Sequence, residues 1–306
     1  MKQIIIFVIT VMLASSCGSI AKKDHTAEHG RVPLLSLVFD DGNDTDYLVA
    51  REVLIKQGVA ASFAVVTGWI GKKNYMTVSQ LLDLQRDGFE IMSHTVSHPN
   101  LNSLDEKEIE SEFSASKATL EGWGLRVNNL TYPYNKNNDL ARELAGKYYR
   151  SGRGGRSMLN LAVAERYELK SYSFGHNTAR MKELVDIASA EGKWLIFYLH
   201  KMDDKVKTSH GNGDFWPGEE LLFSPSGARG RYRKELFNRF YFIPLSGTPQ
   251  SGDTVTGQSS SATCYIDEIF YNGKEALKEL IDYVRSRHPA MRIVTINKGL
   301  DIYNVK

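Results

Sequence analysis

The chain has 306 residues, of which 42% are hydrophobic; this is enough for one large α/β domain or two smaller ones and excludes a disordered or fibrous protein. Lysine and arginine number 38 against 36 acidic residues, and the formal charge of +2 gives no electrostatic reason to expect a nucleic acid or an anionic membrane surface as partner. A neutral polymer is compatible with this charge.

The first residues are typical of an export signal. An apolar run at 4–13 is too short to span a bilayer as a mature helix, and small residues follow it up to Cys17. Such a cysteine resembles a bacterial lipoprotein cleavage site, although ordinary cleavage nearby is the alternative. We therefore expect 1–17 to be a signal peptide with a lipoprotein box. The protein is then exported, as a cell-envelope lipoprotein or alternatively as a periplasmic or secreted protein, and Cys264 is left as a buried free thiol.

After a polar linker at 18–30, apolar runs alternate with helical patterns. Residues 34–39 are almost continuously apolar, as in a strand covered on both faces. Further strands are predicted at 60–66, 89–92, 129–132, 194–199 and 292–296, and helices at 46–57, 78–86, 105–121, 140–148, 181–190 and 275–287. This succession predicts parallel β/α units, arranged as a closed barrel or as a doubly wound sheet.

A segment at about 202–268, inside a domain that we place at 31–306, breaks the alternation. It has no helical period, many glycines and serines, and short strand-like runs at 241–245 and 264–270. Because structureless loops of this length are uncommon, we expect β structure here. Its aromatic residues could stack on sugar rings near a site or form the core of the segment itself: Phe215, Trp216, Phe223, Tyr232 and Tyr241.

Two motifs at predicted strand ends indicate a metal site. Asp40 and Asp41 end the first strand, where α/β enzymes place their sites, although Asp-Asp-Gly is also ordinary turn chemistry. His94 and His98 follow the strand at 89–92. Their four-residue spacing predicts two imidazoles on one face of a helical turn, close enough to share a metal. Two imidazoles and one carboxylate would leave a coordination position open for water.

Two further strand ends carry candidate residues. The strand at 129–132 runs into Pro133 and Tyr134, which taken alone is a proline-marked strand exit. The apolar strand at 194–199 ends in His200, and a single histidine in that position is more often structural. Neither motif is informative without the other three.

In this order the four motifs resemble those of the polysaccharide deacetylase family, the fourth family of carbohydrate esterases, with its NodB-like domain. The family motifs are an Asp-Asp-Gly strand end, His-Ser/Thr-x-x-His-Pro, Arg-x-Pro-Tyr and a late Leu-x-Ile-His strand. The match runs from Ser36 to His200 and resumes in the last helix and strand. The resemblance implies a distorted parallel β/α barrel with the β-rich insertion after the last catalytic strand. It also implies a hydrolase that removes acetyl groups from a polysaccharide.

The resemblance implies a role for each site residue. One divalent metal, zinc or alternatively cobalt, manganese or nickel, would be held by three ligands: Asp41, His94 and His98. Asp40 becomes the catalytic base, His200 the acid, and the backbone N–H of Tyr134 a donor to the oxyanion. These roles are chemically consistent, because a bound metal lowers the pKa of its water towards about 7 and a histidine can protonate a leaving group near neutrality.

The chain departs from the family pattern at two positions. Thr131 stands where the family usually has arginine, and Asn135 where it usually has glycine. Positive charge beside Asp40 must therefore come from elsewhere. Arg153 or Arg156 could supply it, and a solvated basic loop is the alternative for both.

The implied partner is an acetylated polysaccharide or oligosaccharide, most simply one with N-acetylglucosamine-type amides. Hydrolysis of O-acetyl esters, as in acetylated xylan, is the alternative, since both reactions pass through the same tetrahedral oxyanion. A carbohydrate-binding protein without turnover is a third hypothesis, motivated by the two departures and opposed by the complete set of site residues. No nucleic acid is expected, and a membrane only through a lipid on Cys17.

Overall fold

The structure is a computed structural model that describes residues 32–161, 165–175 and 177–303. The signal peptide and lipoprotein box expected at 1–17 and the linker at 18–30 lie outside these residues. Within them, no helix combines the length and the apolar character needed to cross a membrane.

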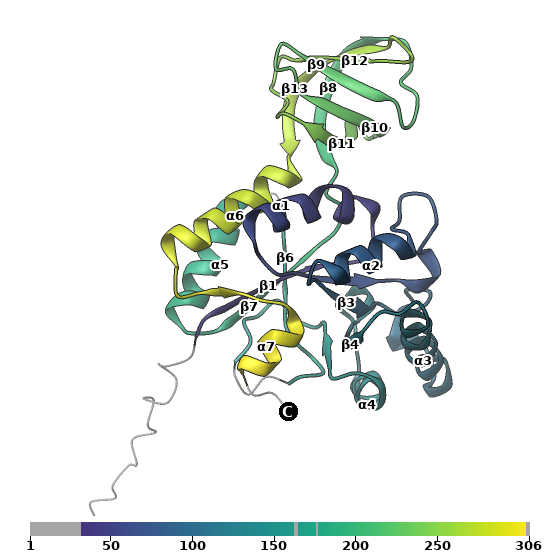
Figure 1. The fold of residues 1–306 in the computed structure, drawn as a ribbon, viewed down its shortest axis with the longest axis vertical. Coiled ribbons are helices and arrows are strands. Elements are labelled where there is room, and N and C mark those ends of the chain that lie inside the picture. Colours follow the sequence, from purple (N-terminus) through teal and green to yellow (C-terminus); the bar gives the residue numbers. More distant parts are fainter. Residues whose placement is uncertain (1–31, 162–164, 176, 304–306) are drawn as a thin grey trace, which may run out of the picture.

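A curled sheet of parallel strands forms the first part of the fold (Figure 1). The strands follow the order β5-β4-β3-β2-β1-β7-β6, and β14 pairs with the start of β1. Because the strands are parallel, their C-terminal ends gather at one edge. Their bounds are β1 Leu34–Phe39, β2 Ser62–Val65, β3 Glu90–Ser93, β4 Val127–Thr131, β5 Ser151–Arg153, β6 Tyr172–Ser173, β7 Trp194–Leu199 and β14 Arg292–Ile293.

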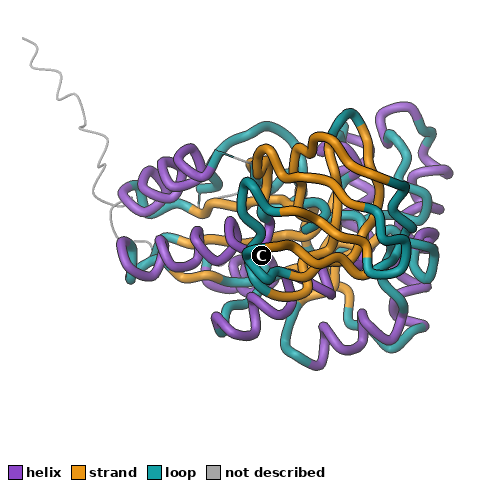
Figure 2. The backbone as a smooth tube through the Cα atoms, turned by 90° about the horizontal axis from the view of Figure 1, so that it is seen from above, coloured by secondary structure: helices purple, strands orange, loops and turns teal. Residues whose placement is uncertain are grey.

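Helices surround the sheet, most of them on its outer face. Seen from above, strands lie in the middle and helices around them (Figure 2). The bounds are α1 Arg51–Gln57, α2 Val78–Arg86, α3 Glu106–Gly122, α4 Asp139–Tyr148, α5 Thr178–Ala190, α6 Gly273–Arg287 and α7 Ile296–Ile302. A π-helical turn, η2 (Asp46–Ala50), leads into α1, and three short 3₁₀ turns follow strands or loops: η3 Thr67–Trp69, η4 Leu101–Ser103 and η5 Pro133–Asn135. Local signals set several helix starts, such as the capping boxes at Thr77 and Asp105.

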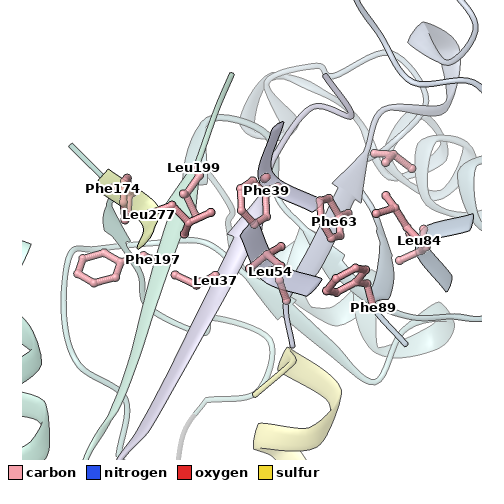
Figure 3. Close-up of a cluster of buried hydrophobic side chains, with 14 of the residues drawn as sticks. Leu37, Phe39, Leu54, Phe63, Leu84, Phe89, Phe174, Phe197, Leu199 and Leu277 are labelled. Atoms are coloured by element: carbon pink, nitrogen blue, oxygen red, sulfur yellow. The ribbon is translucent and has the colours of Figure 1, made fainter. Parts of the chain in front are cut away.

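The two faces of β1 belong to different cores. Leu35, Leu37 and Phe39 join the large cluster under the outer helices, part of which Figure 3 shows. Leu34 and Val38 join a smaller cluster on the inner face, which α7 covers. Every β1 residue is buried, which explains the continuous apolar run in the sequence.

The predicted β/α fold is confirmed, and the sheet is a distorted barrel that does not close between β5 and β6. Two details of the prediction were wrong. The last strand covers only Arg292–Ile293, because Thr295 caps a helix that begins at Ile296. The short strands β5 and β6 carry no apolar period and were missed.

The insertion forms a closed six-stranded barrel of its own (Figure 1). Phe223 and Tyr232 lie in its core and Phe215 packs against it, whereas Trp216 is 58% exposed. Cys264 is a free thiol in the same core, and burial raises its pKa to about 12. The strands are β8 Asp204–Asn212, β9 Glu220–Ser224, β10 Arg229–Leu236, β11 Arg239–Ser246, β12 Thr254–Gly257 and β13 Thr263–Tyr271.

The separate core predicts that the sheet folds without the barrel. Val206 and Ile269 are register partners, so a short Gly/Ser linker can replace 206–269 without moving the chain ends. We expect the shortened protein to unfold cooperatively on heating, at a lower temperature because Ile243 of the barrel packs in the main core. Circular dichroism measures the transition. A chain without a cooperative transition would show that the barrel is part of the folding unit.

Candidate metal centre

The first motif turns sharply at the end of β1. Asp40 continues the strand with its N–H donating to the Leu199 carbonyl at 2.8 Å, and its carboxylate is buried. Asp41 then takes a left-handed conformation with φ of 77°. Because the backbone conformation changes between them, the two successive carboxylates point into different surroundings. Asp40 is buried under the sheet edge, and Asp41 faces His94 and His98.

Asp41, His94 and His98 come together at this edge. The Nε2 atoms of His94 and His98 each lie 3.6 Å from Asp41 Oδ1, and one ligand atom from each residue lies within 4.8 Å of the others. Asp41 Oδ1 is buried and accepts no hydrogen bond from any described residue. A buried carboxylate oxygen without a partner is costly, and a cation between the three side chains would provide one. The residues therefore fit a divalent metal, and their role as ligands stays a prediction.

The His94 ring is held in the state that a metal ligand needs. Its Nδ1 lies 2.8 Å from the Thr131 carbonyl, so this nitrogen carries the proton and Nε2 keeps its lone pair towards Asp41. Burial, with a smaller contribution from His98, lowers the pKa of His94 to about 3. Burial also lowers the pKa of His98. Both rings are then neutral at physiological pH, as ligation requires.

The segment from His94 to His98 is a loop, so the predicted helical turn was wrong. Thr95 and His98 have φ of 68° and 61°, which no helix allows. Glu112 of α3 holds the loop by accepting hydrogen bonds from the backbone N–H groups of Val96 and Ser97, at 2.7 and 3.0 Å. The loop still brings the rings together, with centroids 4.7 Å apart in a T-shaped arrangement.

Arg153, and not Arg156, pairs with Asp40. Its Nη2 lies 2.6 Å from Asp40 Oδ1 and 2.5 Å from Oδ2, and the two side chains are 1% and 4% exposed. Arg153 is the register partner of Thr131 on the next strand, so the positive charge that the family usually carries at that position stands one strand further along the sheet. Asn135 accepts a further hydrogen bond from Arg153. Thr131 and Asn135, the two positions that depart from the family pattern, thus both neighbour the ion pair of Arg153 and Asp40. Arg156 is exposed.

The remaining predicted residues surround the same edge. His200 Nε2 lies 4.0 Å from Asp40 Oδ2 and from Asp41 Oδ2, and its side chain is 47% exposed. Tyr134 stacks edge-on against His98 at 4.6 Å, and its backbone N–H has no acceptor among the described residues. The sequence analysis missed Trp69, whose ring lies 5.2 Å from that of His98. Its position just beyond β2, at the same sheet edge, is the signal that could have found it.

The geometry predicts which residues retain metal. Asp41→Ala, His94→Ala and His98→Ala should each lose the stoichiometric zinc that the parent protein keeps after loading and dialysis, as elemental analysis would measure. Variants of histidines outside the cluster, His200→Ala and His288→Ala, should keep it. One equivalent of zinc retained by the His94→Ala/His98→Ala double variant would remove this cluster as the metal site.

The buried ion pair predicts a large effect on stability. Arg153→Met should lower the free energy of unfolding by roughly 3–5 kcal/mol, because it leaves the Asp40 carboxylate buried and unpaired. Adding Asp40→Asn to it should restore much of this loss. Urea unfolding measures both, with the exposed Arg156→Met as a control expected within about 0.5 kcal/mol of the parent. Equal stability of the Arg153 and Arg156 variants would contradict the assignment.

Part of the chain is similar to proteins of a known family. Residues 27–150 match the family model for polysaccharide deacetylase, a segment that includes Asp40 and Tyr134 but ends before Arg153 and His200. YxkH of Bacillus subtilis strain 168, a candidate polysaccharide deacetylase, is 30% identical over 112 residues, which are 36% of this chain and 40% of that protein.

One solved structure extends the likeness in fold to most of the chain. The Xyl-CE4 domain of a multidomain xylanase from the hindgut metagenome of Trinervitermes trinervoides superposes with a TM-score of 0.52 at 15% identity, covering 90% of this chain and 92% of that one. A Streptococcus pyogenes deacetylase in complex with acetate is 24% identical and has a TM-score of 0.42, covering 45% of this chain and 62% of that one. The fold matches that of the Xyl-CE4 domain, and residues 27–150 are similar to the polysaccharide deacetylase family.

Proposed function

We propose that the protein is a metal-dependent hydrolase that removes acetyl groups from an extracytoplasmic polysaccharide, with N-acetylglucosamine-type amides as the first candidate. One observation carries the proposal: Asp41, His94 and His98 converge on a buried carboxylate oxygen that has no partner among the described residues, beside a second carboxylate, Asp40. The similarity of residues 27–150 to the polysaccharide deacetylase family supports a hydrolase of acetylated carbohydrate.

A divalent cation held by the three residues would polarise the acetyl carbonyl and make water a better nucleophile near neutral pH. Zinc is the first choice, since two imidazoles and one carboxylate with an open position form a typical catalytic zinc site. Cobalt, manganese and nickel are the alternatives.

Asp40 is suited to act as the general base. Each of its oxygens accepts from the same guanidinium nitrogen of Arg153, which holds the carboxylate in one orientation. A carboxylate oxygen has a second lone pair, so Asp40 can still take the proton of the attacking water. Arg153 is a positioning residue in this scheme, because it acts through Asp40.

His200 and Tyr134 would complete the reaction. The His200 ring lies between solvent and the two carboxylates, so it can donate a proton to the leaving nitrogen as the C–N bond breaks, which releases the amine and acetate. The backbone N–H of Tyr134 would donate to the oxyanion. A single donor of this kind is worth about 10²–10³ in kcat in other acyl-transfer enzymes.

An ester would use the same residues, with an alkoxide as the group that His200 protonates. Acetate release measured side by side on N-acetylglucosamine oligomers, peptidoglycan and acetylated xylan would identify the substrate. A metal-loaded protein that released acetate from none of the three would favour a carbohydrate-binding protein without turnover. The same proposal places the protein in the cell envelope, anchored through Cys17, with periplasmic or secreted protein as alternatives; the sequence at 4–17 supports it.

The proposed acid and base can be tested without disturbing the metal. Asp40→Asn keeps the size of the side chain and removes its basic function, so we expect stoichiometric metal and a kcat lower by about 10²–10⁴, and the same for His200→Ala. Two matched controls, Asp139→Asn and His288→Ala, lie outside the site and should keep the parent kcat. Near-parent turnover by either site variant on an unactivated amide would exclude that residue from proton transfer.

A further inference from the structure

A cavity of about 490 Å³ lies where the inserted barrel meets the sheet edge that carries the metal centre. This volume is within the range of about 300–1,000 Å³ that is usual for small-molecule sites. The walls come from the loop after β1, the loop before α2, the segment between β7 and β8, and the strands β8, β10 and β11 of the barrel. The cavity is lined by Asn43, Asp44, Thr45, Lys73, Asn74, Lys201, Asp203, Lys205, Arg233, Lys234 and Tyr241.

Arg233 forms ion pairs with both carboxylates that line the cavity. It pairs with Asp44 through Nη2, and its Nε lies 3.3 Å from Asp203 Oδ1. Its Nη1 also donates to Asn74 Oδ1 at 2.5 Å. Four lysines of the lining remain, and no carboxylate of the described residues lies within ion-pair distance of any of them: Lys73, Lys201, Lys205 and Lys234.

Two of these lysines form cation–π contacts with an aromatic ring. The ammonium groups of Lys205 and Lys234 lie over the ring of Tyr241, at 5.8 and 5.2 Å from its centroid. Burial lowers the pKa of Lys205, and repulsion from neighbouring cations, including Lys201 and Lys234, lowers it further against the opposing charge of Asp203. Lys205 is half-buried and the other three lysines are exposed. Like charges gathered at one cavity repel one another, and an anion among them would relieve the repulsion.

The cavity and the metal centre share two chain segments. Asn43 lines the cavity two residues after Asp41, and its Nδ2 donates to the Asp40 carbonyl at 3.0 Å. Lys201 lines it directly after His200. A group bound in the cavity would therefore lie close to the candidate metal centre.

We infer that the cavity binds an anionic group of the glycan, a carboxylate or a phosphate, so that the preferred substrate is an acidic acetylated polysaccharide. The inference rests on the proposed function for the reaction and names the substrate class. The formal charge of +2 gave no indication of it, because a nearly balanced composition conceals four unpaired ammonium groups in one place.

Calorimetric binding to the intact protein tests the inference without turnover. The probes are an oligosaccharide of N-acetylglucosamine and glucuronic acid and the same oligosaccharide with its carboxyl groups reduced to alcohols. We expect the acidic form to bind at least about tenfold tighter at low salt, with a preference that decreases as salt screens the lysines. Equal affinity for the two forms would overturn the inference.

Charge-matched variants locate the effect. Lys205→Gln/Lys234→Gln, which removes the two ammonium groups over the Tyr241 ring, should abolish the preference, and Lys73→Gln/Lys201→Gln should reduce it. Lys107→Gln/Lys298→Gln removes the same charge from α3 and α7 and should leave the preference unchanged. The inference is wrong if the control pair and the cavity pairs, each with a normal melting transition, show the same preference.

The source of the anion and the proposed function are tested separately. A phosphorylated N-acetylglucosamine oligomer that binds tighter than the carboxylated one assigns the cavity to phosphate. Inorganic phosphate that binds as tightly as either sugar shows a free-anion site and overturns the glycan assignment. Acetate release is measured on the same oligosaccharides. Charge preference in binding with no acetate released would reject the proposed function alone, and release without charge preference would reject the cavity assignment alone.

Discussion

The ion pair between Asp40 and Arg153 depends on the curvature of the sheet. Asp40 follows β1 and Arg153 ends β5, and three strands lie between β1 and β5 in the sheet. Neighbouring strands are about 4.8 Å apart, so in a flat sheet the two strands would be separated by roughly 19 Å. The observed contacts of 2.6 and 2.5 Å are possible only because the sheet curls. The same curvature brings His94, which follows β3, to Asp41.

Burial gives this site its chemical character. Asp40 and His94 lie at strand ends from which water is mostly excluded, so the Asp40 charge needs a partner and the His94 ring stays neutral. Asp40 has Arg153 as its partner, whereas Asp41 Oδ1 has none among the described residues. The backbone is also strained here, since Asp41, His98 and Tyr134 all have positive φ. The large core under the outer helices supplies the stability that allows such a site.

The barrel is joined to the sheet by charge as well as by chain. Arg233 of β10 reaches Asp44, which follows the first motif, and Asp203, which precedes β8. These contacts fix the barrel beside the candidate metal centre, and no carboxylate of the described residues pairs with the nearby lysines. An insertion with its own core can in this way alter what binds near a site while the residues of the site stay the same.

The sequence by itself determined much of the local structure and which residues form the candidate site. The predicted bounds of β1, α2 and β7 agree with the structure to the residue, because a buried strand or an amphipathic helix shows its burial in its own periodicity. The motifs also named the residues that the structure brings together around Asp41.

Only the tertiary structure decided which arginine pairs with Asp40, how the His94 to His98 loop is held and that the insertion closes into a barrel. Asp40 and Arg153 are 113 positions apart, and two arginines were equally compatible with the sequence. Pairs so distant in the chain meet through strand order, register and curvature, which depend on the packing of all the elements together. No local pattern contains that information.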